Sequence, residues 1–265
     1  MSPRSLPVLR PLFALLLFSA VAPADELKLS VQTRDDKDKP VAADKTIDPK
    51  ATAVVICDMW DDHWCKSAAT RCDALAKKTA PVVDALRTAG ATIIHCPSDT
   101  MDFYKDSKAR QRAKDAKKVE PPKAKDIPAP PLPIDDSDGG CDDVPQPKSQ
   151  KAWTRQHKAI GVDEERDFVS DSGAEVYNVL AARGVKTVLV LGVHTNMCVL
   201  NRTFAIKQLR KWDVDCLLVR DLTDAMYNPK KSPFVTHDEG TQLVIGYVEK
   251  NWCPSVTSEQ LMPKK

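Results

Sequence analysis

The stretch VKTVLVLGVHTNMCV, residues 185–199, is the strongest indication of the fold in this sequence. Its first nine residues are almost continuously apolar, which is typical of a strand buried on both faces of a parallel sheet. The runs ATAVVIC at 51–57 and ATIIHC at 91–96 have the same character, and weaker strand candidates lie at 153–160 and 214–220. These runs predict the strands of one buried sheet.

Helical patterns alternate with these strands. Ala80, Val83 and Leu86 follow helical spacing, and Gly90 closes that segment. The expected helices span 75–88, 104–118, 171–183, 196–211 and 237–250. Strands that alternate with helices of this length predict an α/β fold with a parallel, doubly wound sheet. In such sheets the ligand crevice lies beyond the carboxyl ends of the strands.

The remaining segments frame this domain. Residues 25–50 are charged and lack periodicity, so we expect a mobile lead-in, and 251–265 is expected to form a C-terminal tail. Eight prolines between Pro121 and Pro147 exclude a regular element there. We therefore interpret 119–149 as a proline-rich insertion that lies over the surface of a domain spanning 51–250.

The first 24 residues have the features of a signal peptide. Arg4 and Arg10 precede an apolar run at 12–22, and Ala22 and Ala24 are small residues at the positions that a signal peptidase reads. A transmembrane anchor is the alternative, but spanning a bilayer takes about 20 apolar residues. We expect cleavage near Ala24 and export to the periplasm or the extracellular space.

Composition limits the partners. The chain has 39 basic and 37 acidic residues, and removing Arg4 and Arg10 leaves 39 − 2 = 37 basic residues, a neutral balance. A neutral chain has no bulk attraction for nucleic acid or for an anionic membrane. We therefore expect a small-molecule substrate, no nucleic-acid partner and no membrane partner after cleavage, and the sequence leaves open whether a homo-oligomer forms.

Export changes how the eight cysteines are interpreted, because an oxidising compartment permits disulfides. There is no CxxC motif, so neither a thioredoxin-type site nor a zinc knuckle is indicated. Three cysteines in apolar runs are interpreted as buried small side chains: Cys57, Cys96 and Cys216. Four in polar or loop contexts are candidates for one or two bridges, with three pairings open: Cys65, Cys72, Cys141 and Cys253.

Three side chains with chemical potential lie near expected strand ends. Asp58 ends the first buried strand, Lys158 lies in the weak strand candidate, and Cys198 follows the strongest strand by five residues. Cys198 would start a helix, whose free N–H groups would stabilise a thiolate. Nucleophile, base and orienting charge are the parts of covalent catalysis. Each residue alone also has a structural explanation, as a buried thiol, a turn-capping carboxylate or a solvated amine.

The segments AVVICDMWDDHWC, GVHTNMCVLNRTFAIKQL and VRDLTDAMYNP resemble those of the isochorismatase-like cysteine hydrolases, over about 51–250 apart from the insertion. The resemblance implies a three-layer α/β/α fold with a mostly parallel six-stranded sheet. It also implies an Asp-Lys-Cys triad that cleaves an amide-type C–N bond through a thioester. Carried onto this chain, Asp58 is the base, Cys198 the nucleophile and Lys158 the orienting charge.

The resemblance further implies a cis peptide bond between Val193 and His194. The N–H groups of His194 and Cys198 would then form an oxyanion hole. His194 stands where the family usually has a small residue, and the residues around Lys158 lack the family's usual flanking pattern. We expect the substrate pocket to include Trp60, Trp64, Thr195 and Asn196.

No cofactor or metal is expected. The metal-binding branch of the family has an Asp-x-His motif after the second strand, which the stretch 95–101 lacks. Asp61, Asp62 and His63 could be offered as substitute ligands, but a polar loop after a strand explains them equally well.

Two other functions remain open at this stage. The fold could serve as a binding or assembly module without turnover, with Cys198 inert and the segment 121–147 filling the crevice. Alternatively, a thiol-independent isochorismatase-type ether hydrolase would require Asp58 and survive the loss of Cys198.

Overall fold

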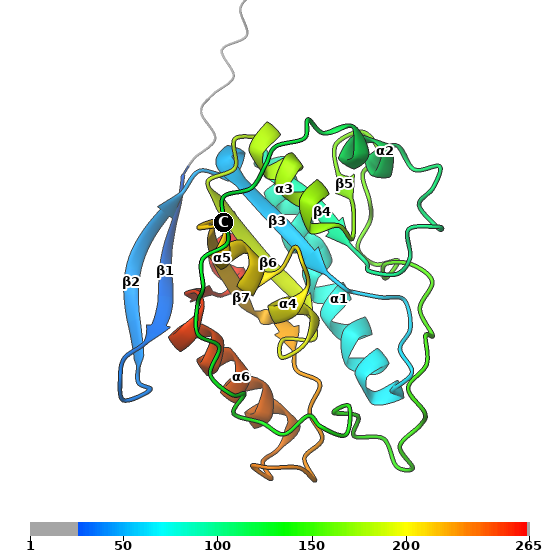
Figure 1. Cartoon of the computed structure of the whole chain (residues 1–265), viewed down its shortest axis with the longest axis vertical. Coiled ribbons are helices and arrows are strands. Elements are labelled where there is room, and N and C mark those ends of the chain that lie inside the picture. Colours follow the sequence, from blue (N-terminus) through cyan, green and yellow to red (C-terminus); the bar gives the residue numbers. More distant parts are fainter. Residues whose placement is uncertain (1–25, 264–265) are drawn as a thin grey trace, which may run out of the picture.

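The computed structural model describes residues 26–263, and the expected signal peptide lies outside this range. One sheet runs through the molecule in the order β2-β1-β8-β7-β6-β3-β4-β5 (Figure 1). The α/β class and the mostly parallel sheet are confirmed, although the sheet has eight strands rather than six. The strands are β1 (Leu27–Arg34), β2 (Pro40–Ile47), β3 (Thr52–Cys57), β4 (Thr92–Cys96), β5 (Phe168–Val169), β6 (Thr187–Val193), β7 (Asp215–Asp224) and β8 (Ser255–Val256).

The central pair β3 and β6 forms the predicted double-sided core. Every residue of both strands is buried, which explains their continuous apolar sequences. They run parallel, with Cys57 opposite Gly192. β4 continues the sheet beyond β3 and β7 continues it beyond β6, so the order of connection reverses between β3 and β6. A ligand crevice is expected at this switch point, just after Cys57 and Val193.

Helices cover both faces of the sheet and give three layers. α1 (Lys66–Thr88) packs on the face of β3 that Val54 and Ile56 occupy. The opposite face, with Val55, contacts α3 (Gly173–Ala182), α4 (Cys198–Asn201), α5 (Ile206–Lys211) and α6 (His237–Asn251). The remaining helix, α2 (Lys108–Asp115), lies beside β5. The helices at 171–183 and 237–250 were predicted close to where they lie, whereas α1 begins earlier than the predicted 75–88 and α2 is shorter than the predicted 104–118.

Local sequence signals explain where two of these helices begin. The Ser172 side chain accepts from the backbone N–H of Glu175 and caps α3. Thr236 and Glu239 form a reciprocal capping box at the start of α6. The element boundaries on this face therefore follow directly from hydrogen-bonding side chains in the sequence.

The lead-in and the tail are both part of the sheet, which corrects the sequence interpretation. Residues 25–50 were expected to lack regular structure, but β1 and β2 pair antiparallel over eight residues each. Residues 251–265 were expected to form a tail, but β8 pairs with β7 on one side and with β1 on the other. β2 is exposed at most of its positions, so its residues carry no apolar period that could reveal a strand.

Two other element predictions were wrong. Residues 153–160 are not a strand, since their only pairing there is an isolated bridge between Trp60 and Gln156. The strand beyond β4, at that edge of the sheet, is β5 instead, and it has only two residues. The helix expected at 196–211 is broken into α4 and α5, and the intervening Arg202 has an extended backbone with φ −60° and ψ 154°.

The proline-rich insertion at 119–149 has no helix or strand, as expected, and passes over the helices of one face (Figure 1). Its backbone binds α3 through Asn178 (2.9 Å), α5 through Lys211 O (2.8 Å) and α6 through the Tyr247 hydroxyl (2.7 Å). Within the described part of the chain, no helix has the length and apolar character that crossing a bilayer requires.

A disulfide between Cys65 and Cys141 fastens the insertion to the start of α1. This is one of the pairings that the sequence left open, while Cys72 and Cys253 are free and buried. The Asp143 carboxylate reinforces the junction, because it accepts from the N–H groups of Lys66 (2.6 Å) and Ser67 (3.0 Å) at the start of α1.

Removing this bridge is expected to destabilise the protein. The cysteines are 76 residues apart, and closing a loop of that length stabilises a fold by about 4 kcal/mol in the chain-entropy model. The Cys65→Ala/Cys141→Ala double variant should therefore melt about 10 °C lower than the wild type in a calorimetric scan. A reductant should lower the wild-type melting temperature and leave that of the variant unchanged. Equal melting temperatures for the two proteins would contradict the stabilising role.

Candidate active site

Asp58 lies immediately after β3, at the switch point of the sheet. Its side chain is fully buried, and its backbone is left-handed with φ 46°, a conformation that non-glycine residues seldom adopt and that clusters at functional sites. The backbone is held by its N–H, which donates to Cys96 O (3.0 Å). One carboxylate oxygen, Oδ1, accepts from the Ser98 N–H at 2.7 Å.

Arg202, and not Lys158, is the cation at this carboxylate. Arg202 Nε lies 2.9 Å from Asp58 Oδ2, and its Nη2 lies 3.5 Å from an Asp99 oxygen. Lys158 is exposed to solvent in a turn, next to His157, which pairs with Asp73 on α1. The expected role of Lys158 in the site is therefore corrected. Arg202 follows Cys198 by four residues, and this spacing was a signal in the sequence that went unused.

Cys198 faces the same carboxylate from the turn after β6. The negative charge of the Asp58 carboxylate helps to raise the pKa of the Cys198 thiol, as expected for two groups that lie close together. Gly192 allows β6 and β3 to approach closely here: it has φ 115°, and a Cβ on it would lie 2.0 Å from Cys57 O. Cys198 is a free cysteine and is half-buried.

Burial and charge keep the Cys198 thiol protonated at rest. Burial, followed by the negative charge of Asp58, raises the Cys198 pKa to about 12, although Arg202 opposes this. Burial also raises the Asp58 pKa, against the lowering effects of Arg202 and of the Ser98 N–H. The expected helix-stabilised thiolate is corrected, because α4 has four residues only. The arrangement is a neutral thiol near a carboxylate that is able to take its proton.

Two backbone amides beside the thiol are free to bind an oxyanion. The Val193–His194 peptide bond is cis, the geometry that was expected at this position. The His194 carbonyl accepts from the N–H groups of Met197 (3.0 Å) and Val199 (3.2 Å), which tightens the turn around Cys198. Within residues 26–263, neither the His194 N–H nor the Cys198 N–H donates to another group.

Four expected pocket residues lie around this turn, with different roles. The Trp60 indole is nearly buried, donates to Ser98 O (3.1 Å) and stacks on Trp153. Trp64 packs under the insertion, against Gly139 and the two cysteines of the disulfide, Cys65 and Cys141. It therefore supports the insertion instead of lining a substrate pocket. Thr195 and Asn196 are buried, and their side chains form hydrogen bonds within the protein. The Thr195 hydroxyl binds the Thr223 hydroxyl (2.7 Å), and the Asn196 side chain binds Asp136 (2.8 Å) and the Met226 backbone.

The residues considered as substitute metal ligands do not converge. Asp61 accepts from Thr154, Asp62 pairs with Lys66, and His63 lies in an aromatic cluster. Among the described residues, one group has the spacing of metal ligands: Cys65, Cys141 and Asp143. Its two sulfurs are joined in the disulfide and are not thiolate ligands, so this group does not fit a metal ion.

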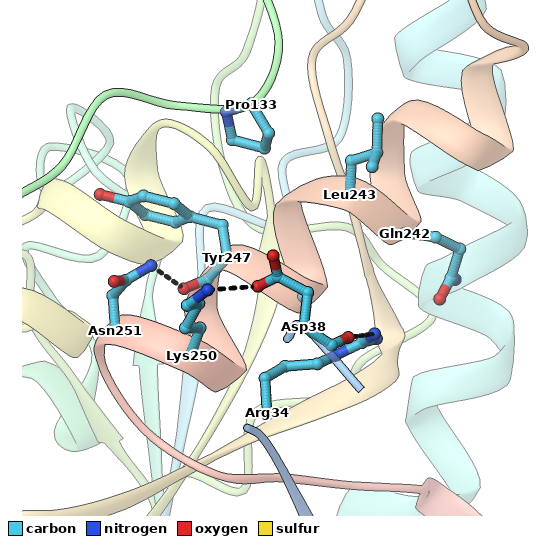
Figure 2. Close-up of a pocket in the computed structure, with 9 residues that line it drawn as sticks. Arg34, Asp38, Pro133, Gln242, Leu243, Tyr247, Lys250 and Asn251 are labelled. Atoms are coloured by element: carbon cyan, nitrogen blue, oxygen red, sulfur yellow. Dashed lines mark hydrogen bonds and ion pairs between the residues drawn. The ribbon is translucent and has the colours of Figure 1, made fainter. Parts of the chain in front are cut away.

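A cavity elsewhere, of about 280 Å³, lies between α6, the end of β1 with the turn that follows it, and Pro133 of the insertion (Figure 2). Its charged groups are paired with one another or with neighbours: Lys250 binds Asp38 (2.6 Å), and Arg34 binds the Asp38 carbonyl (2.9 Å) and Glu249 (2.7 Å). None of the residues that line it belongs to the Asp58 site.

Comparison with known proteins gives similarity in fold. No protein-family model matches the chain, and no curated protein matches it in sequence. A cysteine hydrolase from Pseudomonas syringae pv. phaseolicola is 17% identical with a TM-score of 0.49, over 81% of this chain and 92% of its own. An isochorismatase from Pseudomonas putida is 13% identical with a TM-score of 0.49, over 82% and 92% of the two chains. An isochorismatase family protein from Burkholderia thailandensis is 16% identical with a TM-score of 0.43, over 80% and 93%.

Proposed function

We propose that this protein is a cysteine hydrolase that cleaves an amide-type C–N bond of a small carbonyl compound. The observation that carries the proposal is the closeness of the Cys198 thiol to the buried Asp58 carboxylate, which raises the thiol pKa, beside two backbone amides that have no partner among the described residues. A thiol, a base and oxyanion donors that meet at one point are the parts that acyl transfer needs.

The chemistry follows from these positions. Asp58 takes the thiol proton as the Cys198 sulfur attacks the carbonyl carbon, and the developing oxyanion binds the His194 and Cys198 amides. The protonated Asp58 gives its proton to the leaving nitrogen, the C–N bond breaks, and a thioester remains. Water then attacks the thioester and passes a proton to Asp58, which returns it to the sulfur as the carboxylic acid leaves. Arg202 keeps Asp58 ionised between these transfers.

A screen for ammonia release tests this function. The oxidised protein, with its signal segment removed, is incubated with a panel of small primary amides and with vinyl ethers. Ammonia release from at least one amide is expected. Cleavage of a vinyl ether alone would overturn the proposal.

A thiol-independent hydrolase is the second candidate, and one observation favours it. A Cys198 pKa of about 12 leaves almost no thiolate at neutral pH. In that case Asp58 and Arg202 would act on water or on the substrate directly, and the thiol would be a bystander. Activity that survives replacement of Cys198 would identify this mechanism.

We also propose that the protein acts outside the cytoplasm. The sequence of the first 24 residues supports this, together with the Cys65–Cys141 disulfide, which persists in oxidising compartments. Fractionation of cells, with N-terminal sequencing of the mature protein, tests it: a mature chain beginning near Asp25 is expected, and an intact Met1 in the cytoplasmic fraction would contradict it.

Replacing Arg202, the cation beside Asp58, should change the pH dependence of hydrolysis. Arg202→Gln removes the cation that lowers the Asp58 pKa, so that pKa rises and the acidic limb of the pH–rate profile moves to higher pH. We expect kcat/KM at neutral pH to fall about 10- to 100-fold. Lys158→Ala, a change at the exposed lysine, should leave both the rate and the profile unchanged. A larger loss in the lysine variant than in the arginine variant would contradict this assignment.

A further inference from the structure

An aromatic cluster adjoins the proposed catalytic turn. The rings of Trp60 and Trp153 stack with centroids 4.0 Å apart, and the His63 ring lies parallel to Trp153 at 5.8 Å. His63 meets His194 edge-on at 5.2 Å. The cluster therefore joins three segments: the loop after β3, the chain that follows the insertion, and the turn that holds Cys198.

Two polar atoms of this cluster are buried without a partner. Trp153 Nε1 and His194 Nε2 are both shielded from solvent and form no hydrogen bond within the described residues. His194 is only 3% exposed. A buried polar atom without a partner destabilises a fold by about 1 to 3 kcal/mol, so a ligand atom that hydrogen-bonds to either group would gain binding free energy.

The two histidine rings of the cluster can form hydrogen bonds but carry no charge. Burial lowers the His63 pKa to about 4 and the His194 pKa to about 3, so both rings are neutral at pH 7. The nearby cations already have acidic partners. Arg71 pairs with Asp142 and Asp224, and Arg202 with Asp58.

His237 offers no uncommitted charge either, because it pairs with Asp224 at 2.8 Å. A carboxylate on the substrate would therefore find no uncommitted cation among the described side chains around the turn, and its desolvation would go uncompensated.

We propose that His194 and Trp153 determine substrate specificity, by hydrogen-bonding the non-reacting part of a planar, uncharged amide that packs against the aromatic cluster. This inference rests on the proposed amide hydrolysis and adds its substrate class. The inference of a planar substrate rests on the nearly parallel Trp60, Trp153 and His63 rings, a stack that a flat group could extend.

Paired substrates test the class. Benzamide is compared with cyclohexanecarboxamide, which removes planarity, and 4-methylbenzamide with 4-carbamoylbenzoate, which adds a charge far from the reacting bond. We expect kcat/KM to be at least about tenfold higher for the flat or neutral member of each pair, the equivalent of one hydrogen bond or ring contact. Equal rates within both pairs would overturn the inference and leave amide hydrolysis standing. No hydrolysis of any amide would overturn the proposed function itself.

Two variants test the residues. Trp153→Phe keeps an aromatic ring and removes Nε1, and His194→Gln replaces the ring while keeping a polar end. For 4-methylbenzamide we expect KM to rise about tenfold in each, with kcat changed less than threefold in Trp153→Phe. Trp212→Phe is the matched control, because that indole packs on Tyr177 away from the turn. Unchanged KM in both variants would overturn the inference.

Binding to the Cys198→Ala protein gives a readout that does not depend on turnover. Titration of 4-methylbenzamide, followed by tryptophan fluorescence, should show saturation that Trp153→Phe weakens about tenfold in that background. Equal affinity with and without Trp153 Nε1 would contradict the role of this indole.

Discussion

Replacing Cys198 with alanine is expected to lower kcat/KM for amide hydrolysis at least about a thousandfold, because the nucleophile of the thioester step is lost. Stability should change little, since Cys198 is only partly buried and the substitution removes one sulfur. Ammonia release under saturating amide, together with a thermal scan of both proteins, measures the two effects.

Cys72→Ala is the matched control for this variant. Cys72 is also a free cysteine, but it is buried on α1 and contacts the Trp60 carbonyl (3.6 Å) rather than Asp58. We expect this variant to keep wild-type turnover. Full hydrolysis by Cys198→Ala would refute the thioester mechanism and favour the thiol-independent hydrolase.

Replacing Asp58 with asparagine should have two effects of opposite sign. Hydrolysis should fall about a thousandfold or more, because an amide cannot take the thiol proton. The Cys198 pKa should fall, because the Asp58 charge and hydrogen bond both raise it, while Arg202 lowers it and would lose its partner. The variant should therefore be a poorer enzyme with a more reactive thiol.

Alkylation with iodoacetamide across pH 7 to 10 separates these effects. Faster labelling of Cys198 in Asp58→Asn than in the wild type is expected at each pH, and peptide mass spectrometry assigns the label to Cys198. Slower labelling in the variant would show that Asp58 does not govern the thiol. Retained hydrolysis would remove Asp58 from the mechanism.

The buried strands and most helices follow from the sequence for a physical reason. β3, β4 and β6 are buried on both faces, so their sequences are continuously apolar and conspicuous. The β1–β2 hairpin was missed because β2 is largely exposed and pairs with β1, which in turn joins the sheet by pairing with β8. Pairing between backbones leaves no periodic signature when neither face is buried.

The site was predictable in part. Asp58 and Cys198 could be placed together because the carboxyl ends of β3 and β6 meet at one edge of the sheet. Lys158 was placed wrongly because 153–160 was taken for a strand, whose end would have met the crevice. Arg202 reaches Asp58 because the backbone between α4 and α5 is extended there, a break that helical periodicity did not reveal.

Mass spectrometry of the protein during turnover tests the central claim most directly. The oxidised enzyme is mixed with a hydrolysed amide, quenched in acid within the first turnovers, and digested. An acyl group on the peptide that contains Cys198, absent from Cys198→Ala and removed by hydroxylamine, is the predicted result. Steady ammonia release with no acylated peptide at any quench time, and with undiminished rate in Cys198→Ala, would contradict the account.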